Sequence, residues 1–100
     1  MYMTNYEKTK HIIRALLGQK LTGCELKVCL YFVDELYGHT GHKQVESSSY
    51  QHIAMITGFK RRQIVYSIKL LESKHIIQKQ LYATKYGNSY AFIKPDLWLK

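Results

Sequence analysis

A chain of 100 residues is long enough for one domain with a modest hydrophobic core, and 46% apolar and 22% charged residues are typical of a globular protein rather than a disordered one. No apolar run approaches the roughly 18 residues that a membrane span needs, and residues 1–8 lack the apolar stretch of a signal peptide. Two cysteines are too few for a disulfide scaffold. We therefore expect a soluble cytoplasmic protein without membrane partners.

The positive charge is concentrated in the second part of the chain. Residues 1–59 hold six Lys or Arg and five acids, whereas residues 60–100 hold nine basic residues and two acids and so carry +7 of the net +8. A basic block confined to part of a small domain is typical of a surface that binds a polyanion. A solvated lysine-rich surface without a partner is the alternative.

The first helix is predicted after a flexible N-terminal arm of residues 1–8, and residues 9–100 are predicted to form a single domain. Thr9 can cap this helix and Gly18 can end it. Its apolar stripe consists of Ile12, Ile13, Leu16 and Leu17.

The second helix has the clearest start signal. Residues 22–25 read Thr-Gly-Cys-Glu, a capping box in which the Thr22 hydroxyl and the Glu25 carboxylate bond the amides of the first turn. Helical spacing predicts one buried face, and Gly38 ends the helix. That face consists of Leu26, Cys29, Leu30, Val33, Leu36 and Tyr37. In the polar loop that follows, Lys43–Glu46 can form a short strand.

Two further helices joined by a tight turn follow. Ser49 can cap a helix over Tyr50–Thr57, in which Ile53 and Ile56 point inward beside Ala54. Gly58 supplies the turn. The next helix runs from about Lys60 to Lys74, with a buried stripe of Ile64, Ile68 and Leu71. This arrangement is a helix-turn-helix.

A β-hairpin is predicted after these helices. Residues 75–82 and 89–93 are rich in β-branched and aromatic side chains, and Gly87-Asn88 lies in the turn between them. The sequence therefore predicts an α+β, mainly helical winged helix-turn-helix fold. It has about four helices and a two-stranded wing, with the short strand near Lys43–Glu46 as an optional third.

The helix from Lys60 carries the predicted DNA contacts. With its apolar stripe facing inward, Arg62, Tyr66, Lys69 and Ser73 face outward, and Arg61 and Gln63 flank them. Arg62 can donate two hydrogen bonds to a guanine edge, and Gln63 can pair similarly with adenine. Tyr66 and Lys69 suit phosphate contacts better.

The start of this helix is electrostatically unfavourable in isolation. A helix N-terminus carries partial positive charge, so each of the cations Lys60, Arg61 and Arg62 costs about 0.3–1 kcal/mol there. Lys60 is also a poor cap. A bound phosphate would reverse the sign of this penalty, which favours a functional reason for the cluster. We interpret Arg62 as a base reader, and Arg61 and Lys60 as anchors.

The predicted wing adds further candidates. Lys79 on the first strand and Lys85 near the tip can lie along the phosphate backbone, and Tyr86 can pack on sugar. For Lys79, a charge that protects a sheet edge is an equally good interpretation.

Metal and catalytic sites are not expected. Cys24 and Cys29 with His39 and His42 resemble the residue types of a zinc finger. However, five helical positions place the two cysteines about 140° apart around the axis. The sequence contains no Gly-rich phosphate loop and no nucleophile–base set. We therefore expect no catalytic residues, no metal and no cofactor.

Several segments resemble, in the same order, the N-terminal domain of phage-type replication protein O. They are Glu25–Val28, Leu36–Gly38, Ser49–Arg62, Ile68–Glu72 and Ile93–Trp98. The resemblance covers most of residues 9–98 and implies a winged-helix domain that binds repeated sites at a phage origin. The position before the first wing strand, often Gly in winged-helix proteins, is His75. Family members continue into a long C-terminal region that recruits replication partners, whereas this sequence stops at Lys100. We expect either one domain of a longer protein or a free-standing DNA-binding protein, and in the second case a small transcriptional regulator is an equal expectation.

The expected function is sequence-selective binding of double-stranded DNA by a phage, virus or plasmid-type protein in a prokaryotic host cell. Replication or transcription proteins are further expected partners. The alternatives are a protein-interaction module that binds an acidic factor, and single-stranded nucleic-acid binding. We expect a monomer, with a homodimer as the alternative.

Overall fold

The computed structural model describes residues 4–37, 45–48, 50–79 and 88–99. Four helices are present in these segments: α1 (Asn5–Leu17), α2 (Gly23–Tyr37), α3 (Tyr50–Thr57) and α4 (Arg61–Ser73). They are joined by β1 (Val45–Ser48), β2 (Ile77–Lys79), β3 (Asn88–Phe92) and the short 3-10 helix η1 (Pro95–Leu97). The α+β, mainly helical class and the winged-helix layout are thus confirmed.

The three strands form one antiparallel sheet in the order β1-β3-β2. In the β2–β3 pair, Ile77 lies opposite Phe92 and Lys79 opposite Tyr90. The third strand is present over Val45–Ser48, two residues beyond the predicted end at Glu46, and residues 43 and 44 of the prediction lie outside the described residues. The strand prediction over 75–82 was too long at its start, because His75 and Ile76 belong to the turn that leaves α4.

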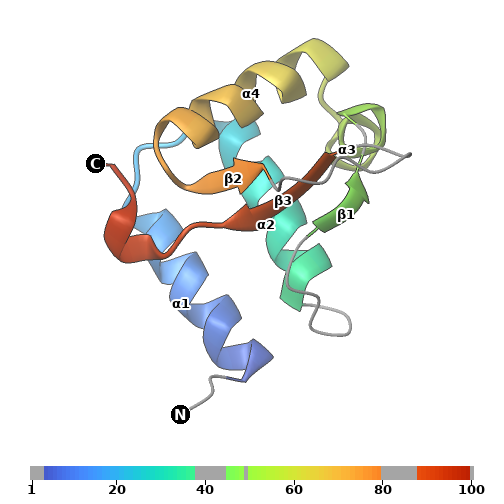
Figure 1. Cartoon of the computed structure of the whole chain (residues 1–100). Helices are drawn as coiled ribbons and strands as arrows, with labels where there is room; N and C mark the ends of the chain where they lie inside the picture. The colour runs from blue at the N-terminus through green and yellow to red at the C-terminus, as the bar shows by residue number, and fades with distance from the viewer. Residues whose placement is uncertain (1–3, 38–44, 49, 80–87, 100) are drawn as a thin grey trace.

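Helix α2 occupies the centre of the molecule, and α4 and α1 lie on opposite sides of it (Figure 1). Residues from all four helices and from the sheet contribute to one apolar core. Its most deeply buried large side chains are Tyr90, Phe32, Ile53, Ile64, Ile68, Leu71, Ile76 and Ile77. Helix α4 thus lies along one edge of the molecule with its apolar stripe against α2 and α3.

Helix α1 begins five residues before the predicted start, at Asn5. Thr4 is its N-cap: the Glu7 amide donates to Thr4 Oγ1 over 3.1 Å, and the Thr4 hydroxyl donates to the Glu7 carboxylate. Thr9 therefore lies inside the helix, and residues 5–8 are helical rather than part of an arm. The reason is that Thr4 has a glutamate three positions later, which Thr9 lacks. Leu17 is 77% exposed, contrary to the predicted stripe.

Helix α2 has the predicted capping box but a different buried face. The Glu25 amide donates to Thr22 Oγ1 over 3.2 Å, and the Thr22 amide donates to the Glu25 carboxylate over 3.1 Å. Leu26 and Leu30, predicted as core, are 37% and 43% exposed. Cys29 and Val33 are buried as predicted, and the rest of the buried face consists of Glu25, Val28, Tyr31 and Phe32. The side chains of Leu36 and Tyr37, and Gly38, lie outside the described residues.

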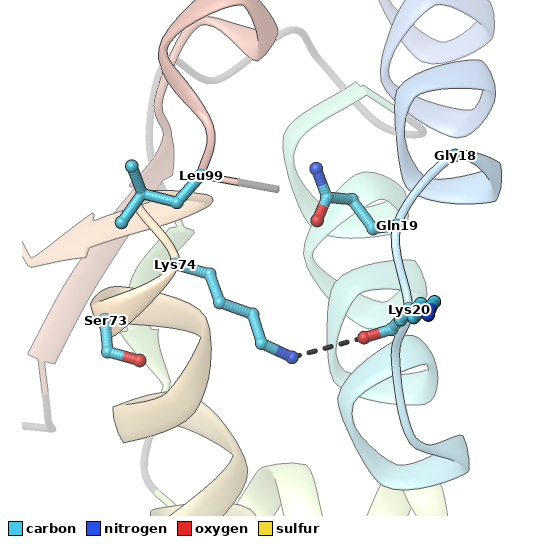
Figure 2. Close-up of a pocket in the computed structure, with 6 residues that line it drawn as sticks. All are labelled: Gly18, Gln19, Lys20, Ser73, Lys74 and Leu99. Carbon is cyan, nitrogen blue, oxygen red and sulfur yellow. Dashed lines mark hydrogen bonds between the residues drawn. The ribbon is translucent and has the colours of Figure 1, made fainter.

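The buried face of α2 includes one acid, Glu25, whose charge is paired. Its carboxylate is 1% exposed and accepts a 2.8 Å hydrogen bond from Lys74 at the end of α4. Burial opposes ionisation of this carboxyl, but hydrogen bonds from Lys74 and Thr22 outweigh it and lower its pKa. The Lys74 ammonium also bonds the Lys20 carbonyl over 3.3 Å, across a hollow between the ends of α1 and α4 (Figure 2).

The helix-turn-helix has the predicted bounds for α3, and Gly58 adopts a φ of +82° in the turn. Ser49, the predicted cap, lies outside the described residues. Ile53 and Ala54 are buried as predicted, but Ile56 is 62% exposed. Thr57 takes the buried position because its hydroxyl donates to the Ile53 carbonyl over 2.8 Å and so needs no water.

The turn between α4 and β2 has a left-handed residue that is not glycine. His75 has a φ of +59°. Its amide donates to the Glu72 carbonyl and the Ile76 amide to the Leu71 carbonyl, each over 3.0 Å. This is a Schellman motif, completed by the apolar pair Leu71 and Ile76, both 0% exposed. The sharp turn directs the chain from α4 into the sheet.

Candidate nucleic-acid interface

The outward face of α4 is built as the sequence predicts. Ile64, Ile68 and Leu71 are at most 1% exposed, so α4 is fixed in rotation about its axis. The opposite side consists of exposed side chains: Arg62, Tyr66, Lys69 and Ser73. A shallow depression along this face is lined by Arg61, Arg62, Val65, Tyr66 and Lys69. These residues form the α4 face.

The first turn of α4 concentrates positive charge at exposed positions. Lys60 is the N-cap residue, and Arg61 and Arg62 are the first two helical residues. All three side chains are exposed. A lysine ammonium has no acceptor for the amides of the first turn, and residues 61–63 contain no acid. The predicted conflict between these cations and the helix dipole is therefore present.

Gln63 has a structural role in this turn. Its Oε1 accepts a 2.9 Å hydrogen bond from the Lys60 amide, which is the returning half of a capping box. Bidentate pairing with adenine would compete with this bond, because it needs the same amide group. The structure therefore favours Gln63 as a cap over Gln63 as a base reader.

Arg61 lies beside α3 rather than at the centre of the α4 face. Its guanidinium carbon is 5.6 Å from the centroid of the Tyr50 ring, within the range of a cation–π contact. Tyr50 is half-buried at the start of α3, and its hydroxyl is 3.2 Å from that of Tyr90 in β3. Sequence reasoning missed Tyr50, since no local pattern relates position 50 to position 61.

Of the three DNA contacts predicted in the wing, the structure describes one. Lys79 is exposed at the end of β2, opposite Tyr90 of β3. The His75 turn connects β2 directly to α4, so Lys79 lies on the element that follows the α4 face. Lys85 and Tyr86 lie outside the described residues, and their roles stay predictions.

The two cysteines have different surroundings. Cys29 is 0% exposed; burial and, secondarily, the negative charge of Glu25 raise the pKa of its thiol to about 12, although Lys74 opposes this. The Cys24 thiol donates to the Gln63 carbonyl over 3.7 Å. In the described segments no group of three His, Cys, Asp or Glu side chains is placed to hold a metal ion. His39 and His42 lie outside those segments.

No helix within the described residues combines the length and the apolar character that crossing a bilayer requires. Compared with protein-family models, curated proteins and solved structures, the chain matched none of them. The resemblance to replication protein O therefore stays a prediction, and the conclusions about function rest on the geometry of α4 and its neighbours.

Proposed function

We propose that this protein binds double-stranded DNA with sequence selectivity, and that α4 enters the major groove. The observation that carries the proposal is the α4 face: a helix fixed by its buried stripe presents two arginines, a tyrosine and a lysine at one edge of the molecule. A major groove admits one α-helix, and arginine and lysine are the residues that contact guanine edges and phosphates there.

Two further features support this proposal. The cations at the start of α4 are unfavourable for the isolated helix and become favourable beside phosphate. Lys79 is an exposed cation at the end of β2, the strand that follows α4, where it would contact the phosphate backbone. In this arrangement Arg62 reads a base, and Lys60, Arg61, Lys69 and Lys79 bind phosphates.

The biological setting of the proposal comes from the resemblance alone. It suggests an origin-binding domain or a small regulator of phage, virus or plasmid type, acting in the cytoplasm of a prokaryotic host. A palindromic target from selection of bound duplexes out of a random pool would favour a dimer, and repeated single sites would favour the origin-binding role.

The deciding experiment measures binding of a labelled random duplex over a range of salt concentrations. The test variant replaces Lys60, Arg61 and Arg62 with alanine. The control replaces three exposed cations of α1, Lys8, Lys10 and Arg14, and so removes the same charge from the opposite side of the molecule. We expect the test variant to lose most duplex affinity and the control to lose little. Equal affinities of wild type and test variant at low salt would refute the proposal.

A protein-interaction role is the second candidate. It is favoured by the exposed apolar side chains of Leu26 and Leu30 on α2 and of Met55 and Ile56 on α3. A protein with net charge +8 that used these residues would bind an acidic polypeptide rather than DNA. Charge-matched titrations with polyglutamate and with duplex DNA separate the candidates, because DNA recognition through α4 requires tighter binding to the duplex.

A further inference from the structure

The first two arginines of α4 have different surroundings. Arg62 points straight out from the helix, whereas Arg61, about 100° away around the axis, points towards α3. There its guanidinium lies over the ring of Tyr50 at 5.6 Å. Both arginines line the depression on the α4 face, so both reach the proposed DNA surface.

The Tyr50 ring is itself held in place by the sheet. Its hydroxyl is 3.2 Å from the hydroxyl of Tyr90, which is 1% exposed. The Tyr90 ring stacks on Phe32 of α2, with centroids 5.5 Å apart and an interplanar angle of 26°. The direction of Arg61 is thus tied through Tyr50 and Tyr90 to the core and to the strand that pairs with β2.

We propose that Tyr50 is a positioning residue that holds Arg61 at the edge of the α4 face as a phosphate clamp, leaving base recognition to Arg62. This inference rests on the proposed duplex-DNA function and deepens it. Arg61 would bind one phosphate of the backbone where α3 crosses it, as the first helix of a helix-turn-helix does.

A position over an aromatic ring suits a phosphate clamp for two reasons. The N–H groups of a guanidinium point outward in its own plane, so an aromatic ring against its face leaves them free to donate to phosphate oxygens. An arginine already held in one conformation also loses less side-chain entropy when it binds. Arg62, which faces outward, can instead follow the edge of a base in the groove.

The test uses random duplex DNA, because binding to random sequence depends on phosphate contacts. The slope of log K against log salt concentration changes by about 0.9 for each phosphate contact. We expect Arg61→Ala and Tyr50→Leu each to make the slope shallower by about that amount. Since both changes remove the same contact, the double variant should match either single variant.

Three controls accompany this measurement. Tyr50→Phe loses the hydroxyl contact with Tyr90 but keeps the ring, which also packs against the apolar core, so this variant should keep the wild-type slope. Tyr6→Leu makes the same replacement at a tyrosine on α1 that is 75% exposed, and should also keep it. In selection from a random pool, Arg61→Ala should retain the wild-type base preference while Arg62→Ala loses it.

The results separate this inference from the proposed function. If wild-type protein binds no duplex, the proposed function itself fails. If wild type binds but Tyr50→Leu keeps the wild-type slope, or if the effects of Tyr50→Leu and Arg61→Ala add, the positioning role of Tyr50 is refuted. If Arg61→Ala alters base preference, the division of roles between the two arginines is refuted.

A second measurement does not depend on how well Tyr50→Leu folds. In the NMR spectrum of the free wild-type protein, the Arg61 side-chain protons should be shifted upfield by the Tyr50 ring, and Tyr50→Phe should retain the shift. Random-coil shifts for these protons in wild type would overturn the inference.

Discussion

Replacing Glu25 with glutamine removes one negative charge from the interior while keeping the shape of the side chain. In the structure this carboxylate is 1% exposed and accepts hydrogen bonds from the Thr22 amide, the Thr22 hydroxyl and the Lys74 ammonium. The glutamine oxygen can still accept from Thr22, so the capping box survives. The bond that changes is the one from Lys74, which loses its anionic acceptor.

The expected loss of stability in Glu25→Gln follows from the loss of that single bond. A hydrogen bond to a charged group contributes about 1.5–3 kcal/mol, and Lys74 is 31% exposed, so part of its loss is recovered by water. We expect Glu25→Gln to lower the free energy of unfolding by about 2 kcal/mol. For a domain of this size that corresponds to a fall in Tm of roughly 8–16 °C. Lys74→Met should cost more, because it leaves a buried carboxylate without its cation.

The assay is urea unfolding at several pH values. Because the pKa of Glu25 is lowered in the folded protein, its contribution is present above the ordinary value of 4.5 and is lost as the pH falls through the folded-state pKa. Glu25→Gln should therefore be less stable than wild type at neutral pH, and its free energy of unfolding should fall less steeply as the pH is lowered. Glu72→Gln, a change at a half-buried acid of α4, is the control and should stay within about 0.5 kcal/mol.

Two results would contradict the reasoning about Glu25. One is a neutral-pH loss below about 0.5 kcal/mol for both Glu25→Gln and Lys74→Met. The other is strict additivity in the double variant, since removing both partners eliminates the uncompensated charge and should cost less than the sum of the single changes.

In urea unfolding, His75→Gly should have a free energy of unfolding about 1 kcal/mol higher than His75→Ala, because glycine adopts a positive φ without a Cβ penalty. Equal stabilities of the two variants would contradict this. Arg62→Ala should relax the base preference and cost about 1–3 kcal/mol of binding free energy. Lys69→Ala should weaken binding to all duplexes evenly and make the salt dependence of binding shallower, which binding titrations would measure. In a thiol-labelling time course at pH 8, Cys24 should react well before Cys29, because burial and a pKa of about 12 keep the Cys29 thiol neutral. Equal labelling rates would contradict the burial of Cys29.

Local signals account for the parts of the fold that sequence predicted well. The capping box at Thr22, the turn at Gly58 and the stripe of Ile64, Ile68 and Leu71 each depend on residues within one or two helical turns. The outward α4 face follows from that stripe, because fixing the buried side of a helix fixes the opposite side. These features needed no knowledge of what the helix packs against.

Contacts between distant residues account for what sequence could not predict. Helix α2 has apolar side chains on both of its sides, so periodicity could not choose between Leu26 and Val28 for the core. The choice depends on what packs against each side of α2: the buried side faces α4, where Glu25 bonds Lys74, 49 positions away. The contact between Arg61 and Tyr50 likewise arises only when α3 and α4 are packed together.

The two ends of α4 are held very differently, and this has a consequence for how the helix can adapt. At its C-terminal end, Lys74 bonds the α1–α2 connection and α2 through its ammonium and accepts a 2.8 Å hydrogen bond from the Leu99 amide. At its N-terminal end, the side-chain oxygen of Gln63 accepts a hydrogen bond from the Lys60 amide and caps an exposed turn. Helix α4 therefore has its backbone anchored at both ends, by Lys74 and by the buried Ile64, and its freedom to adapt lies in the exposed side chains of Lys60 and Arg62. Small errors in docking can then be absorbed by these two side chains, without disturbing the core or the contact between Arg61 and Tyr50.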